Sequence, residues 1–106
     1  TPLYWYGMSG HMKNFVDRWS QSLRDTSLHF KEKMKGKKMY VVIVGGDNPK
    51  LKALPLIAQF QYIFDFVGSS FEGYVIGDAN GLNEIKDDAE ALAKAQLYNN
   101  EFKNSK

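Results

Sequence analysis

Apolar residues recur along the chain with two different spacings, and these spacings predict alternating helices and strands. After Ser9 an apolar side chain returns every three to four residues, which predicts a helix with Ser9 as its N-cap and an ion pair between Lys13 and Asp17. The apolar positions of this helix are Met12, Phe15, Val16, Trp19 and Leu23. Residues 29–38 form a charged connector, in which Gly36 precedes the first predicted strand.

Two short apolar segments are typical of β-strands. Residues 39–46, MYVVIVGG, are apolar at every position before the two glycines. A short run of this kind predicts a strand buried on both faces, as in a parallel sheet covered by helices. Residues 71–77, FEGYVIG, predict a second and shorter strand, whose Glu72 and Gly73 suit a position near a sheet edge.

Two further helices are expected, one between the strands and one after them. After a loop that contains Pro49, residues 54–67 predict a helix that ends at Gly68 as its C-cap. Its apolar face is expected to contain Leu54, Ile57, Ala58, Phe60, Phe64 and Val67. The segment GDANGLN predicts a loop, and the last helix is expected to begin at about Asn83, its N-cap, and to end in a polar tail. Its inner face is expected to contain Ile85, Ala89, Leu92 and Ala93.

The order helix, strand, helix, strand, helix predicts an α/β fold with a parallel sheet and helices on both faces. Two strands are too few to bury three amphipathic helices, and they leave unpaired edges. We therefore expect residues 1–106 to form a single partial domain, with the neighbouring strands supplied by a parent protein or by another chain. The open edge and the uncovered apolar face also predict a homodimer or a larger homo-oligomer.

Composition and charge narrow the classes of partner. The chain has 106 residues, 43% hydrophobic and 25% charged, which is ordinary for one small globular domain. Its net charge of +2 comes mostly from one lysine-rich stretch and predicts no nucleic-acid partner. The absence of cysteine suits a reducing cytoplasm, and the apolar runs are too short to predict a membrane span. Neither His11 nor His29 has neighbours spaced to bind a metal, so no metal is expected.

Three stretches of the chain together resemble one known family. They are TPLYWYGMSGHMKNFVDRW, then KKMYVVIVGGD, then FEGYVIGDANG followed by EI. In this order they resemble the C-terminal portion of the flavodoxin-like NAD(P)H-dependent FMN oxidoreductases, which include NADPH-dependent FMN reductases and quinone reductases. The resemblance covers most of the chain and is most specific in TPLYWYGMSGHMKNFVDRW. It implies a flavodoxin-like fold that here lacks the N-terminal strands and the phosphate-binding loop.

The resemblance implies that the opening segment lies against the ring of FMN. A flat and mostly apolar ring requires aromatic or thioether packing and a backbone that approaches closely. The residues expected to bind the cofactor there are Pro2, Leu3, Tyr4, Trp5, Tyr6, Gly7 and Met8. Gly45 and Gly46, at the carboxyl end of the first strand, are expected beside the pyrimidine edge of the ring, whereas Asp47 is a doubtful contact. Without the resemblance, Tyr4, Trp5 and Tyr6 would instead be interpreted as aromatic residues of a core or of a dimer interface.

The resemblance also implies the activity: electrons pass from NADH or NADPH to FMN, and then to a quinone, a free flavin or a similar acceptor. The cofactor carries this reaction and the protein aligns the two rings, so no catalytic residue is assigned. Two alternatives stay open, a non-catalytic flavodoxin-type electron carrier and an inactive truncated fragment that self-associates. Because the phosphate-binding loop has no counterpart, we expect FMN to bind more weakly than in a complete relative. The lysines at 31–38 either attract a dinucleotide phosphate or form a solvated connector.

Overall fold

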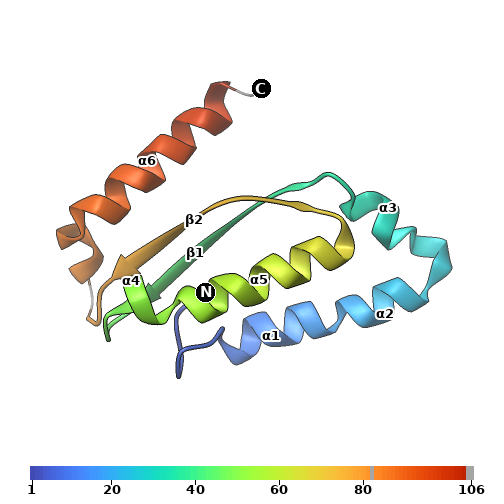
Figure 1. Ribbon diagram of the computed structural model, residues 1–106, viewed down its shortest axis with the longest axis horizontal. Helices are drawn as coiled ribbons and strands as arrows, with labels where there is room; N and C mark the ends of the chain where they lie inside the picture. The colour runs from blue at the N-terminus through green and yellow to red at the C-terminus, as the bar shows by residue number, and fades with distance from the viewer. Residues whose placement is uncertain (82, 105–106) are drawn as a thin grey trace.

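Helices lie on both sides of a parallel pair of strands in the computed structural model, which describes residues 1–81 and 83–104 (Figure 1). Strand β1 (Lys38–Gly45) pairs in parallel with β2 (Ser70–Asp78). The chain between them forms a short helix, α4 (Pro49–Lys52), and a long one, α5 (Leu54–Val67). The expected α/β fold with parallel strands is therefore confirmed, and the connector after the first strand contains a helix that the sequence did not predict.

The register of the two strands is interrupted once. Met39 pairs with Phe71, but the next residue, Tyr40, pairs with Gly73, so Glu72 is the extra residue of a β-bulge. A Cβ on Gly73 would lie 2.5 Å from the ring carbon that carries the Tyr98 hydroxyl, so the end of the Tyr98 side chain packs against the bare backbone of the bulge. The bulge explains why a charged residue and a glycine are tolerated inside a strand.

The segment before β1 folds into several short helices rather than one. They are α1 (Gly10–Asp17), α2 (Trp19–Arg24), the 3-10 helix η1 (Thr26–Leu28) and α3 (Phe30–Met34). The first two replace the single helix expected from Ser9, and a turn at Arg18 separates them. Two sequence predictions are confirmed here, because the Ser9 hydroxyl accepts a hydrogen bond from the Met12 amide and Lys13 pairs with Asp17. The expected charged connector is partly helical, through α3.

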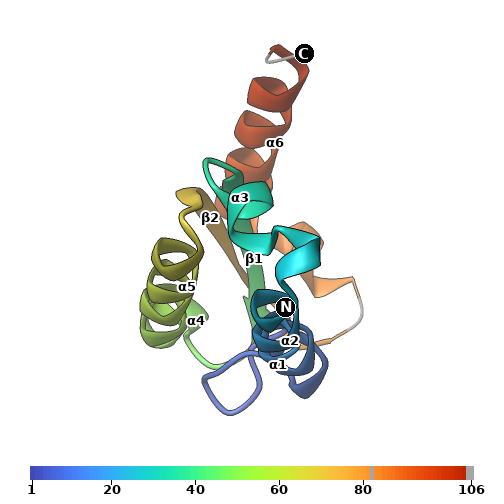
Figure 2. The same cartoon turned by 90° about the vertical axis from the view of Figure 1, so that its right-hand side faces the viewer.

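The buried core lies between the strands and α5. In Figures 1 and 2, α1, α2 and α5 lie on one side of the strands and the last helix lies on the other. The core consists of Val41, Ile43, Ala53, Leu56, Phe60, Phe64 and Ile76, with Met8, Met12 and Trp19 packed against it. Leu56 is completely buried, whereas Leu54 is 42% exposed and Ala58 is also exposed, so the expected apolar face of α5 was wrong at these two positions.

The opposite face of β1 is only partly covered, which corrects the prediction of a strand buried on both faces. Val42 is 56% exposed, although its neighbours Val41 and Ile43 are buried. The last helix, α6 (Ala89–Asn104), reaches this face through Tyr98 and Phe102. The rings of these two residues contact Tyr40, near the amino end of β1. The uninterrupted apolar run therefore forms a strand that is buried on one face and only partly covered by α6 on the other.

The last helix begins later than the sequence predicted. Residues Glu84–Asp87 form a 3-10 helix, η2, and Asn83 has a left-handed backbone without a capping hydrogen bond. The cap is Asp88, whose carboxylate accepts from the Ala91 amide at 3.0 Å. The buried residue of α6 is Ala91, while Ala89, Leu92 and Ala93 are exposed, so the expected inner face was wrong at these three positions. Its fourth member, Ile85, is half-buried but lies in η2. The expected loop GDANGLN includes Leu82, and the expected tail includes residues 105 and 106, which lie outside the described residues.

Asp88 joins three elements at the carboxyl end of the sheet. Its side chain is 9% exposed, and it accepts from the Ala91 and Asp78 amides and pairs with Lys50 at 3.0 Å. These backbone hydrogen bonds and Lys50 lower the pKa of Asp88 from 3.8 to about 2. The carboxylate therefore stabilises the folded chain.

We expect Asp88→Ala to lower the free energy of unfolding by about 0.5–2 kcal/mol at neutral pH, because the helix loses its cap. Since the pKa is lower in the folded chain, the charged carboxylate contributes fully above pH 3.8, and this contribution is lost as the pH falls to about 2. Urea unfolding of both proteins from pH 6 to pH 2 tests this expectation. Asp88→Asn, which keeps a capping oxygen but no charge, is the control. Equal pH dependence in all three proteins would contradict the assignment.

No helix among those described is both long and apolar enough to cross a membrane. Within residues 1–81 and 83–104, no three histidine, aspartate or glutamate side chains gather closely enough to hold a metal ion.

Candidate functional site

The first residues of the chain lie along the edge of β1 that β2 leaves free. The Thr1 ammonium donates to the Val42 carbonyl at 2.7 Å, and the Val44 amide donates to the Thr1 carbonyl at 3.3 Å. The Leu3 amide then donates to the Val44 carbonyl at 2.8 Å, and Pro2 and Val44 form a parallel bridge. Residues 1–3 thus act as a third parallel segment beside β1, and the chain leaves it at the carboxyl end of the strands.

A tight turn follows this segment. The backbones of Tyr4 and Gly7 exchange two hydrogen bonds of 3.0 Å, so Trp5 and Tyr6 are the two central residues. Both have positive φ angles, 49° for Trp5 and 66° for Tyr6, which is the pattern of a type I′ turn. Side chains other than glycine, asparagine and aspartate rarely adopt this conformation, so the turn is strained. Trp5, at the tip of the turn, is 95% exposed.

An open hollow of about 310 Å³ lies between this turn and the ends of the two strands. It is lined by Leu3, Trp5, Tyr6, Gly46, Asp47 and Asn80. These residues come from three segments that are far apart in the sequence but meet where the parallel segments end. In open α/β sheets this edge is where ligands bind.

Two glycines let these segments approach each other. A Cβ on Gly45 would lie 3.0 Å from the Leu3 Cβ, so the segment before the turn packs directly on the end of β1. A Cβ on Gly46 would lie 2.5 Å from Asn80 Oδ1 and 2.9 Å from the Asn80 Cβ. Asn80 is itself held in place, because its backbone amide donates to Glu84 Oε2 at 2.7 Å. Hydrogen bonds from the Asn80 and Gly81 amides lower the pKa of Glu84, which stays a carboxylate acceptor.

Two side chains meet on Asp47 at the rim of the hollow. The Tyr6 hydroxyl donates to Asp47 Oδ2 at 2.8 Å, and the Lys52 ammonium donates to the same oxygen at 2.7 Å. The ammonium also lies 5.6 Å from the centre of the Tyr6 ring. We refer to these contacts of Tyr6, Asp47 and Lys52 as the Asp47 bridge. The Lys52 hydrogen bond and then the Tyr6 hydrogen bond lower the pKa of Asp47, and the bond to Asp47 raises the pKa of Tyr6.

The structure brings together four of the nine predicted cofactor-binding residues at the hollow, namely Leu3, Trp5, Tyr6 and Gly46. Others support it from outside: Pro2 lies in the bridge to β1, Tyr4 and Gly7 close the turn, and Gly45 packs under Leu3. Met8 does not line the hollow, because its side chain packs against the core.

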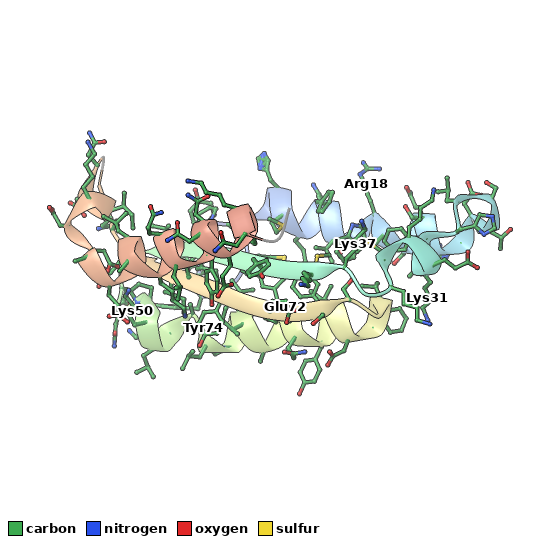
Figure 3. The ribbon with its side chains drawn as sticks, turned by 90° about the horizontal axis from the view of Figure 1, so that it is seen from above. Arg18, Lys31, Lys37, Lys50, Glu72 and Tyr74 are labelled. Atoms are coloured by element: carbon green, nitrogen blue, oxygen red, sulfur yellow. The ribbon has the colours of Figure 1, made fainter. Side chains whose placement is uncertain are left out.

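Two residues at the hollow, Asn80 and Asp47, were not predicted to bind there. The signal for Asn80 was its position just after β2, at the same sheet edge as Gly46. Asp47 was not among the predicted contacts, and its partner at the hollow is a tyrosine hydroxyl forty-one positions earlier in the chain. By contrast, the lysine-rich connector ends at the amino end of β1, and Figure 3 shows Lys31 and Lys37 far along the strands from Lys50. These lysines therefore lie away from the hollow.

Comparisons with known proteins agree with this architecture. A family model described as a flavodoxin-like fold matches residues 1–100. A Bacillus subtilis (strain 168) protein with the provisional name NAD(P)H-dependent FMN-containing oxidoreductase YwqN is 56% identical over 96 residues, which are 90% of this chain and 53% of that protein. The solved structure entitled "The Structure of Trp Repressor Binding Protein from Bacillus subtilis" is also 56% identical and superposes with a TM-score of 0.87. That match covers 90% of this chain and 58% of the solved chain, so this chain spans little more than half the length of either relative.

Proposed function

The chain belongs to the family with a flavodoxin-like fold, and from this premise we propose that its hollow holds the ring end of FMN in an NAD(P)H-dependent oxidoreductase. The observation that carries the proposal is the meeting of Leu3, the turn and Gly46 at the carboxyl edge of the parallel segments. The name of the Bacillus subtilis relative supports it, because that protein is named as FMN-containing and NAD(P)H-dependent.

The residues of the hollow fit a flavin ring chemically. Leu3 and the exposed Trp5 indole offer apolar surface to a flat ring, and Gly46 leaves room for its edge. The Asn80 amide offers both a donor and an acceptor to polar atoms on that edge. The two hydrogen bonds that close the turn leave the Trp5 and Tyr6 amides unused by the turn itself.

The hollow does not fit the phosphate end of the cofactor. Its volume of about 310 Å³ lies at the lower limit of ligand pockets, roughly 300–1,000 Å³. The described residues that line it include no lysine, arginine or glycine-rich loop at a helix N-terminus, which are the usual partners of phosphate. We therefore propose that these residues bind the ring and that the chain by itself binds FMN weakly.

When bound, FMN supplies the chemistry of two-electron transfer, which requires no acid or base from the protein. The chain's own residues act by position: Leu3 and Trp5 pack on the ring, and Gly46 and Asn80 fix where its edge can lie. We propose a quinone, a free flavin or a similar small molecule as electron acceptor. Self-association and a cytoplasmic location stay predictions.

Addition of FMN and then NADH or NADPH, followed by flavin absorbance without oxygen, tests the proposal. Direct bleaching of the flavin by NADH or NADPH supports an oxidoreductase. Flavin that binds but is bleached only by a separate reductase would indicate an electron carrier. Absence of any FMN binding at millimolar concentrations would contradict both.

We expect Trp5→Ala to weaken FMN binding roughly two- to tenfold, because an aromatic contact contributes about 0.5–1.5 kcal/mol beyond the buried area. The dissociation constant follows from quenching of FMN fluorescence. Tyr62→Ala is a matched control, since Tyr62 is an aromatic residue of α5 that is 75% exposed and does not line the hollow. Equal effects of the two substitutions would count against Trp5 as a contact.

A further inference from the structure

The conformation of the turn requires an explanation beyond its own sequence. Trp5 and Tyr6 both have left-handed backbones, with φ angles of 49° and 66°, and neither is a residue that favours this region. The Trp5 side chain is 95% exposed and so contributes little packing that could hold the turn. Besides the two hydrogen bonds between Tyr4 and Gly7, the turn is attached to the rest of the chain through Tyr6.

The attachment is the Asp47 bridge. Asp47 lies two residues after the end of β1, and Lys52 is the last residue of α4, so both partners of Tyr6 come from the segment that leaves the sheet. One oxygen, Asp47 Oδ2, receives both the Tyr6 hydroxyl at 2.8 Å and the Lys52 ammonium at 2.7 Å. Lys52 thereby restricts where the carboxylate can lie, and the carboxylate restricts where the Tyr6 ring can lie. The raised pKa of Tyr6 agrees with a hydroxyl that keeps its proton in this contact.

We propose that Asp47, oriented by Lys52, is a positioning residue that holds Tyr6 and thereby keeps the turn in its left-handed conformation, with the Trp5 indole at the edge of the hollow. The purpose of this arrangement rests on the proposed function, since a preorganised indole lowers the cost of binding a planar ring. The contact itself is a property of the chain without ligand.

Stability measurements alone cannot reveal this role. Ion pairs between exposed side chains contribute little to the free energy of unfolding, and the side chains of Lys52 and Asp47 are 43% and 61% exposed. We therefore expect the urea midpoint to stay nearly unchanged when the bridge is removed. The order of the turn is the property that should change.

The test is the backbone order parameter of Trp5 and Tyr6, measured by nitrogen-15 relaxation on the ligand-free chain. In the parent chain both values should be near those of rigid backbone, about 0.85. In Asp47→Ala and in Tyr6→Phe they should fall below about 0.6, the range of flexible backbone. The order parameters of the double variant should fall no further than those of either single variant, because all three variants lack the same contact. Asp47→Asn, which keeps an oxygen that can accept from Tyr6, should restore most of the order.

Asp17→Ala is the matched control. It removes another ion pair between exposed side chains, that of Lys13 and Asp17 in α1, which has no contact with the turn. Unchanged order parameters in Asp47→Ala and Tyr6→Phe would overturn the proposal, as would an equal fall in Asp17→Ala or losses that add in the double variant.

An FMN titration of the same proteins separates this inference from the proposed function. If the order of the turn falls in Asp47→Ala but the parent chain binds no FMN, the positioning role stands and the proposed function fails. If the parent chain binds FMN but its turn is equally ordered in every variant, the proposed function stands and the positioning role fails. If both hold, Asp47→Ala should weaken FMN binding about threefold to tenfold, with Asp17→Ala unchanged.

Discussion

Replacing Leu56 with alanine is expected to lower the free energy of unfolding by about 2–5 kcal/mol, because Leu56 is completely buried between α5 and the strands. The loss combines the transfer free energy of the removed atoms with the cavity that they leave. A small domain has only about 5–15 kcal/mol of total stability, so this one change should remove a large share of it. Urea unfolding followed by circular dichroism measures the loss directly.

Leu54→Ala is the matched control for this expectation. It changes the same residue type in the same helix, two positions earlier, but Leu54 is 42% exposed. We expect it to cost less than about 1 kcal/mol, since less apolar surface returns to water. Losses of equal size at the two positions would mean that the register of α5 against the sheet differs from the one described.

Replacing Gly46 with alanine is expected to weaken FMN binding by at least about tenfold, or roughly 1.4 kcal/mol. The new Cβ would lie 2.5 Å from Asn80 Oδ1 and 2.9 Å from the Asn80 Cβ. Because the new Cβ also meets the Asn80 Cβ, rotation of the Asn80 side-chain amide alone cannot relieve the clash. Asn80 must move with its backbone, and the Glu84 carboxylate that holds this backbone opposes the movement.

Two variants make this prediction specific. Gly10→Ala adds the same methyl group where, among the described residues, no atom beyond the chain neighbours and the backbone of its own helix lies within 4 Å, so it should leave FMN binding unchanged. Combining Gly46→Ala with Asn80→Gly removes the atoms that the new Cβ meets, and should recover part of the affinity. The Asn80 amide resonances report the displacement without ligand. Unchanged FMN binding in Gly46→Ala would exclude this hollow as the ring site.

The elements of the fold followed from the sequence because each has a strong local signal. Alternating apolar periods identified β1, α5 and β2, and Gly68 ended α5 as predicted, with a left-handed backbone at φ 78°. The start of α6 was less predictable. Asn83 and Asp88 are both good capping residues, and the local sequence does not show that Asp88 pairs with Lys50, which lies far earlier in the chain. The exposure of Val42 likewise depends on which helices cover that face of the sheet, and the sequence of the strand alone does not reveal this.

The candidate site likewise contains some features that the sequence predicts and others that it does not. Its aromatic turn and its glycines were visible as a motif, because aromatic residues beside glycine suit a flat ligand. Asn80 and the Asp47 bridge were not visible, since each becomes part of the site only when three sheet-end segments meet. The turn itself was also hidden: YWYG contains glycine only at its last position, and the left-handed conformation lies on Trp5 and Tyr6.

The pairing of residues 1–3 with β1 can open while the rest of the chain stays folded, so the hollow has its own free energy of opening. Three backbone hydrogen bonds hold this segment to residues about forty positions away, and a segment held by so few contacts opens locally at a lower cost than the core. When they break, Leu3 and the turn leave while the β1–β2 ladder and its core remain paired. The hollow would then exist for only a fraction of the time in a molecule that is still folded. An apparent dissociation constant equals the intrinsic one divided by that fraction, so added contacts along the free edge of β1 would tighten ligand binding without touching the ligand.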